Sequence, residues 1–152
     1  MAKRTTSALP AARHRGRVLA LQVLYEADQT GHPWREALRQ QARGPKENRQ
    51  ALAFAEQCIG GVLDHRTELD ALIQRFAPAW PVLQLSAVDR NILRLAPYEL
   101  RWSEEAPPKV AINEAVELAK LFSGEGSHRF INGVLGSAWA EQQPTENTNS
   151  SP

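Results

Sequence analysis

The fold is decided by the stretch ARHRGRVLALQVLYEAD, which occupies residues 12–28. Apolar side chains fill the second half of this stretch and cover most sides of a helix, a pattern typical of a helix at the centre of a protein. Gly31 and Pro33 follow, and both residue types end helices. We therefore expect a central first helix from about Ala12 to Asp28.

The rest of the chain also follows helical periodicity, with no convincing strand alternation. Two capping boxes, at residues 67–70 and 86–89, mark the starts of two helices. The pattern predicts an all-α bundle of about seven helices. The six helices after the first are expected at about Trp34–Arg43, Leu52–Val62, Leu69–Phe76, from Ser86 through Pro97, from Pro107-Pro108 to Phe122, and from Ser127 through Trp139. In the helix that ends at Phe122, the Phe122 side chain is expected on the core face.

Length and composition indicate one globular domain with two polar ends. The chain has 152 residues, of which 42% are hydrophobic and 23% charged, and these values exclude wholesale disorder. Residues 1–11 are small, polar and basic, so we expect a flexible N-terminal arm. Residues 142–152 contain no apolar side chain, so we expect a disordered tail. The domain itself is expected to span residues 12–141.

Several classes of protein are excluded by the residues that the sequence lacks. A single cysteine, Cys58, can form neither an internal disulfide nor a cysteine-based zinc site. The four histidines are scattered without metal-ligand spacing, and no nucleophile lies in a recognisable catalytic arrangement. The sequence contains no signal peptide and no apolar run of the ~18 residues that a membrane span needs. We expect a soluble cytoplasmic protein with no catalytic site, no cofactor and no metal.

The basic residues are concentrated at one end. Residues 1–25 carry five basic side chains and no acid, whereas the rest of the chain has a net charge of −4. Arg13, Arg15 and Arg17 fall in the first turns of the expected helix, where the helix dipole disfavours cations by roughly 0.3–1 kcal/mol each. A bound phosphate removes that penalty. The cluster favours a nucleic acid as partner, with a solvated basic tail as the alternative.

A second basic segment opens the last expected helix. Ser127, His128 and Arg129 follow a glycine-containing loop, and Arg129 precedes the core stripe, so it should face solvent. Its guanidinium group can reach a phosphate or stack on a base. Phe130 falls on the stripe with Val134 and is expected to be at least partly in the core.

Three long blocks in the same order resemble the NusB family of bacterial transcription antitermination factors over roughly residues 12–140. The blocks are RHRGR at 13–17 with QVLY at 22–25, DRNILRL at 89–95 with YEL at 98–100, and KVAINEA at 109–115 with SHRFINGVL at 127–135. The resemblance implies two small helical bundles packed side by side and no catalysis. It implies binding of the boxA element of ribosomal RNA transcripts together with NusE, a small-subunit ribosomal protein. The pair would join NusA, NusG and RNA polymerase and suppress premature termination.

The resemblance also assigns residues. It implies RNA contacts by the helix start and by the loop before the last helix, and it places Tyr25 where RNA and NusE meet and Asp89 on the NusE side. The implied RNA-binding residues are Arg13, His14, Arg15, Arg17, Tyr25, Ser127, Arg129 and Phe130, and the implied NusE-binding residues are Tyr25 and Asp89.

Two alternatives stay open at the level of the sequence. The same fold occurs as the N-terminal domain of certain ribosomal RNA cytosine methyltransferases, but we expect no nucleotide-binding domain within 152 residues. The other alternative is a protein-interaction bundle whose basic end has no RNA partner. The sequence also leaves open whether the isolated protein is a monomer or a homodimer.

Overall fold

Seven α-helices and two short 3₁₀ turns form the computed structural model, which describes residues 2–103 and 106–142. No strand occurs within these residues, so the predicted all-α fold is confirmed. The elements are α1 (Ala2–Thr30), α2 (Trp34–Gln41), η1 (Gly44–Lys46), α3 (Arg49–Asp64), α4 (Arg66–Phe76), η2 (Val82–Gln84), α5 (Ala87–Trp102), α6 (Pro108–Phe122) and α7 (Ser127–Gln142).

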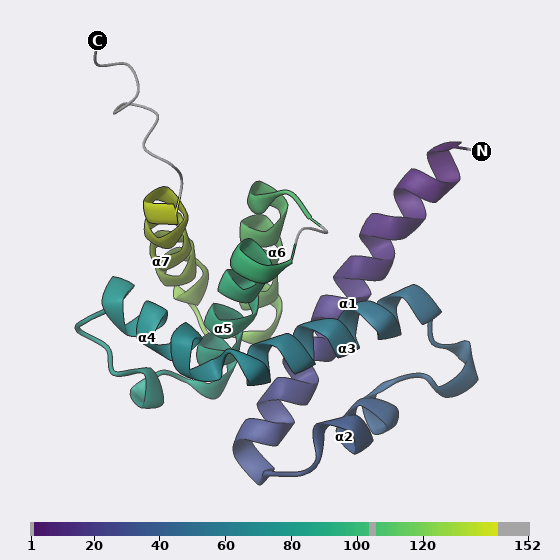
Figure 1. The fold of residues 1–152 in the computed structure, drawn as a ribbon, viewed down its shortest axis with the longest axis horizontal. Helices are drawn as coiled ribbons and strands as arrows, with labels where there is room; N and C mark the ends of the chain where they lie inside the picture. Colours follow the sequence, from purple (N-terminus) through teal and green to yellow (C-terminus); the bar gives the residue numbers. More distant parts are fainter. Residues whose placement is uncertain (1, 104–105, 143–152) are drawn as a thin grey trace.

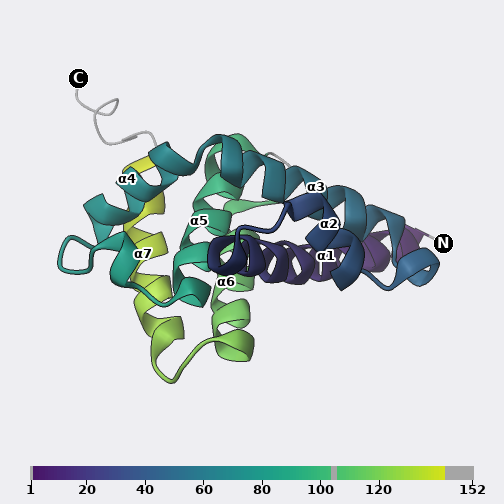
Figure 2. The ribbon, with the colours of Figure 1, turned by 90° about the horizontal axis from the view of Figure 1, so that it is seen from below.

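The helices form two groups. In both views, α1, α2 and α3 occupy one half of the molecule and α4 to α7 the other (Figures 1 and 2). Helix α5 packs against α6 and α7 in its own group and also against α1 and α3, so it joins the two halves. This arrangement agrees with the two packed bundles that the resemblance implies.

Helix α1 is the central helix that the apolar pattern predicts. Leu19, Ala20 and Val23 are fully buried, and α1 crosses α3 at Gly16. A β-carbon at Gly16 would lie 2.8 Å from the carbonyl oxygen of Ala51, so only glycine allows this close crossing. The glycine of the RHRGR block therefore has a packing role.

The first helix begins at Ala2, ten residues before the predicted start at Ala12. Alanine and leucine before residue 12 are strong helix formers, and Pro10 removes only one backbone hydrogen bond. The predicted flexibility of residues 1–11 is not tested by the helical conformation of residues 2–11 and stays a prediction. The predicted disordered tail lies outside the described residues, except for Gln142 at the end of α7.

Of the two predicted capping boxes, the one at residues 86–89 is confirmed for its Ser86 cap, while the Asp89 carboxylate bonds Ser123 and Ser127. Ser86 Oγ accepts a hydrogen bond from the backbone N–H of Asp89 at 3.1 Å, so Ser86 caps α5. The box at residues 67–70 is wrong, because α4 already begins at Arg66. His65 ends α3 and starts α4, and a junction of a single residue leaves no room for a separate capping turn.

Two buried arginines, paired with partly buried acids, fix α5 in place. Arg90 donates to Asp28 at the end of α1 at 2.8 Å, and Arg94 donates to Asp70 on α4 at 2.7 Å. Burial raises the pKa of Asp28, but the hydrogen bonds from Arg90 and Asn91 outweigh this effect and hold it below the ordinary value. These bonds set the position of the α5 start, where part of the candidate site lies.

Candidate nucleic-acid and partner interface

Neighbouring side chains of the arginine-rich segment of α1, residues 13–17, bond three different parts of the fold. His14 Nδ1 lies 2.8 Å from Glu114 Oε2 on α6. Arg15 bonds Glu47, which precedes α3. Arg17 bonds Glu99 on α5. The segment that the sequence marks as an RNA-binding cluster therefore also holds the two halves of the molecule together.

Arg17 lies inside the protein, and the prediction that it contacts RNA is corrected here. Its side chain is 2% exposed, and its Nε and Nη2 donate to the two Glu99 oxygens at 2.9 and 2.7 Å. The guanidinium group also lies 5.0 Å from the centre of the Phe54 ring. Burial disfavours its charge, but the Glu99 carboxylate outweighs burial and holds the pKa of Arg17 above the ordinary value.

The spacing of Arg17 contained a signal for burial. It lies three, four and seven residues before Ala20, Leu21 and Leu24, all of which are buried on one stripe of α1. Its partner Glu99 is 82 residues away, and no local pattern marks it.

Glu47 is a second acid that sequence reasoning missed. It is buried and accepts hydrogen bonds from Arg15 Nη2 at 2.8 Å and from the backbone N–H of Arg43 at 3.2 Å. The hydrogen bond from Arg15 holds the pKa of Glu47 below its ordinary value, in spite of burial. This carboxylate fixes the η1 turn against α1 and leaves Arg15 partly exposed beside it.

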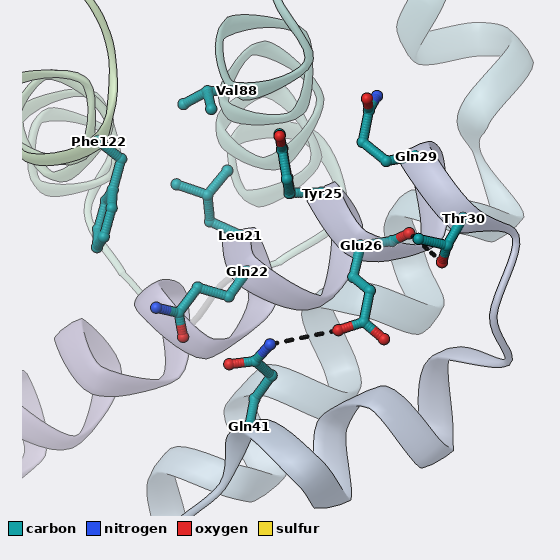
Figure 3. Close-up of a pocket in the computed structure, with 9 residues that line it drawn as sticks. All are labelled: Leu21, Gln22, Tyr25, Glu26, Gln29, Thr30, Gln41, Val88 and Phe122. Atoms are coloured by element: carbon teal, nitrogen blue, oxygen red, sulfur yellow. Dashed lines mark hydrogen bonds between the residues drawn. The ribbon is translucent and has the colours of Figure 1, made fainter.

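An open groove of about 390 Å³ lies further along α1 (Figure 3). Leu21 and Tyr25 of α1, Val88 of α5 and Phe122 of α6 border it. The Tyr25 side chain is 43% exposed and Phe122 is 39% exposed. The prediction that Phe122 lies on the core face of its helix is wrong, because Ala111, Ala115, Leu118 and Ala119 form that face. Two exposed rings beside an apolar groove are typical of a protein-binding surface.

Asp89 holds the loop at one end of this groove. Its carboxylate accepts hydrogen bonds from Ser123 Oγ and, at 3.1 Å, from Ser127 Oγ. Ser127 is the first residue of α7. Its bond to Asp89 therefore attaches the loop between α6 and α7 to the start of α5. Asp89 is nearly buried, so contact with a partner stays a prediction for its carboxylate.

The start of α7 agrees with its sequence pattern. Arg129 is exposed, as expected for the residue before the core stripe. Phe130 is partly buried and packs against the core, beside the fully buried Ile131. Phe130 is thus partly a core residue, as the periodicity predicts.

Comparison with known proteins gives the family. The model of the NusB family matches residues 14–139. The chain belongs to the NusB family. The transcription antitermination protein NusB of Dehalococcoides mccartyi (strain CBDB1) is 46% identical over 126 residues, which are 83% of this chain and 88% of that protein.

Solved NusB structures share the fold. NusB of T. maritima superposes with a TM-score of 0.80 at 32% identity, covering 90% of this chain and 96% of that one. A chain from a crystal structure of the antitermination factors NusB and NusE in complex with dsRNA has a TM-score of 0.76 at 26% identity, covering 86% of this chain and 98% of that one. NusB proteins are antitermination factors and not enzymes, which confirms the prediction of a non-catalytic protein.

The structure brings the residues expected from the NusB resemblance together in two places. Tyr25 lines the groove, and Asp89, which follows the lining residue Val88, is hydrogen-bonded to Ser127. Arg13, with its neighbours His14 and Arg15, lies roughly 18 Å before Tyr25 on the same helix, at 1.5 Å per residue. Among the residues that the structure describes, no cluster of ligands could hold a metal ion, and no helix is long and apolar enough to span a bilayer.

Proposed function

We propose that this NusB-family protein binds boxA-like RNA of ribosomal RNA transcripts together with NusE, and that the pair acts in the cytoplasm with NusA, NusG and RNA polymerase. The observation that carries the proposal is one helix, α1, with a basic surface near its start and an exposed apolar groove near its end. A fold neighbour from a complex of NusB and NusE with RNA supports it.

The RNA surface of the proposal consists of Arg13, His14 and Arg15 on α1 and Arg129 on α7. Guanidinium groups neutralise phosphates. On a single strand, each such contact makes the logarithm of the binding constant fall by ~0.7 for every tenfold rise in salt concentration. Arg17 is left out because its side chain is buried, whereas Arg15 stays partly exposed beside Glu47. Phe130 can offer RNA only the part of its ring that the core leaves uncovered.

The NusE surface of the proposal is the groove between α1, α5 and the end of α6. Tyr25 and Phe122 supply its exposed rings, and aromatic anchors of this kind carry much of the free energy of protein association. Asp89 and Ser127 contribute by fixing the loop that follows the groove residue Phe122.

Replacing Tyr25 and Phe122 together with alanine is expected to weaken NusE binding by about 30- to 1000-fold, because two hot-spot residues of ~1–2 kcal/mol each are lost. Titration calorimetry with purified NusE measures the effect. Both rings are partly exposed, so thermal unfolding should change little. Leu83→Ala is the control, since Leu83 is an exposed apolar side chain on η2, away from the groove. Unchanged NusE affinity in the double variant would rule out the groove as the NusE site.

A further inference from the structure

A second basic surface lies on α2, η1 and the start of α3. Residues 34–56 carry five exposed basic side chains, and the exposed acids among them are Glu36 and Glu56. Glu47 is buried and paired with Arg15. By contrast, residues 57–142 hold eleven acidic and eight basic side chains. The five basic residues of this surface are Arg35, Arg39, Arg43, Lys46 and Arg49.

This surface is joined to the arginine-rich start of α1 by Glu47. One carboxylate accepts from the Arg15 side chain on α1 and from the backbone of Arg43 beside η1. The bonds hold the exposed Arg43 and Lys46 next to the part of α1 that carries Arg13 and Arg15. In Figure 1, α2, η1 and the first turns of α3 lie in the same half of the molecule as α1, on the side away from α4.

A groove of about 310 Å³ between α2 and α3 continues the basic surface. Its walls include Trp34, Arg35 and Arg39 from α2 and Leu52 and Glu56 from α3. The Arg35 guanidinium lies 4.3 Å from the centre of the Trp34 ring. A tryptophan ring and guanidinium planes beside an apolar floor are the surfaces on which unpaired bases stack, without regard to sequence.

We propose that this groove binds the RNA that flanks the boxA-like segment. The single strand runs from the arginine-rich start of α1 over η1, where Lys46 contacts a phosphate, into the α2–α3 groove. There Arg39 contacts a second phosphate, and a base stacks on the Arg35 guanidinium, which lies over the half-buried Trp34 ring. The inference rests on the proposed function, because it extends the same RNA path. RNA is favoured over an acidic protein because the surface continues the α1 cluster and includes an aromatic platform.

The test compares two RNAs, a 12-nucleotide boxA-like strand and a 24-nucleotide strand that adds six nucleotides at each end. Their affinities for the NusE-bound protein are measured by fluorescence anisotropy over a range of salt. The variant is Arg35→Ala/Arg39→Ala/Lys46→Ala, whose three side chains are exposed. The matched control is Arg66→Ala/Arg75→Ala/Arg101→Ala, which removes three exposed arginines outside α2, η1 and α3.

The wild-type protein is expected to bind the long RNA about tenfold more tightly than the short one. The α2–η1 variant should lose that gain, with a salt slope on the long RNA lower by about 1.4 from the two lost phosphate contacts, and should bind the short RNA as the wild type does. The control should keep the gain. Fluorescence quenching by the long RNA should weaken in Trp34→Phe.

Three results would contradict the inference. They are equal affinity of the wild-type protein for the two RNAs, an unchanged gain in the α2–η1 variant, and an equal loss in the control. Failure of the wild-type protein to bind the short RNA would contradict the proposed function as well, so the two failures are distinguishable.

Discussion

Replacing Arg17 with alanine is expected to lower the free energy of unfolding by about 3–5 kcal/mol, the largest stability effect that we predict. The substitution leaves the Glu99 carboxylate charged and buried, at 3% exposure, without its partner. It also removes the guanidinium that lies over Phe54 and one of the bonds between α1 and α5. Urea denaturation followed by circular dichroism measures the loss.

A paired replacement separates the lost charge balance from lost packing. Arg17→Met with Glu99→Leu removes both charges and should recover most of the stability, since apolar residues of similar size often replace buried ion pairs at little cost. RNA affinity of either variant, measured where it is folded, should match that of the wild type. A stable Arg17→Ala protein with weakened RNA binding would instead return Arg17 to the RNA surface.

Replacing Arg13 and Arg129 together with alanine is expected to reduce RNA affinity by about 10- to 100-fold. Two charge-assisted contacts to phosphate or base are lost, each contributing about 1 kcal/mol or more. The salt slope should fall by about 1.4, at ~0.7 for each phosphate contact on a single strand. Fluorescence anisotropy with a boxA-like strand measures both quantities.

The melting temperature of this double variant should fall only modestly. Arg129 is exposed, whereas Arg13 is half-buried with its Nε covered, so the loss of stability comes from Arg13. The control is Arg66→Ala/Arg75→Ala, which removes the same charge from α4. If control and double variant lose equal affinity, net charge rather than a defined site governs binding.

The helices could be predicted from the sequence because their signals are local. The apolar stripe of α1, the Ser86 cap and the core face of α7 each depend on residues within a few turns. The capping signal at residues 67–70 does not mark a helix start, because α3 ends and α4 begins at the same residue, His65. The stripe also placed Phe122 on the core face of α6, but its ring is exposed and lines the groove.

The candidate site could be predicted only in part, because its geometry depends on pairs far apart in the sequence. Charge and resemblance point to α1 and to the start of α7 as the RNA-binding segments, and this stays a prediction. They do not distinguish Arg17, which is paired with Glu99, from Arg15, which remains at the surface beside Glu47. The bond from Ser127 to Asp89 spans 38 residues, so no local pattern shows that Asp89 also anchors the loop between α6 and α7.

The most direct test of the account is the affinity of this protein for a boxA-like single strand in the presence and in the absence of NusE, at one fixed salt concentration. We predict weak binding by the protein alone and binding at least tenfold tighter by the heterodimer, because NusE at the groove would add its own contacts to the RNA held by α1. The affinity for an RNA strand of shuffled sequence should increase less when NusE is added. Equal affinity for the boxA-like strand with and without NusE would contradict the account.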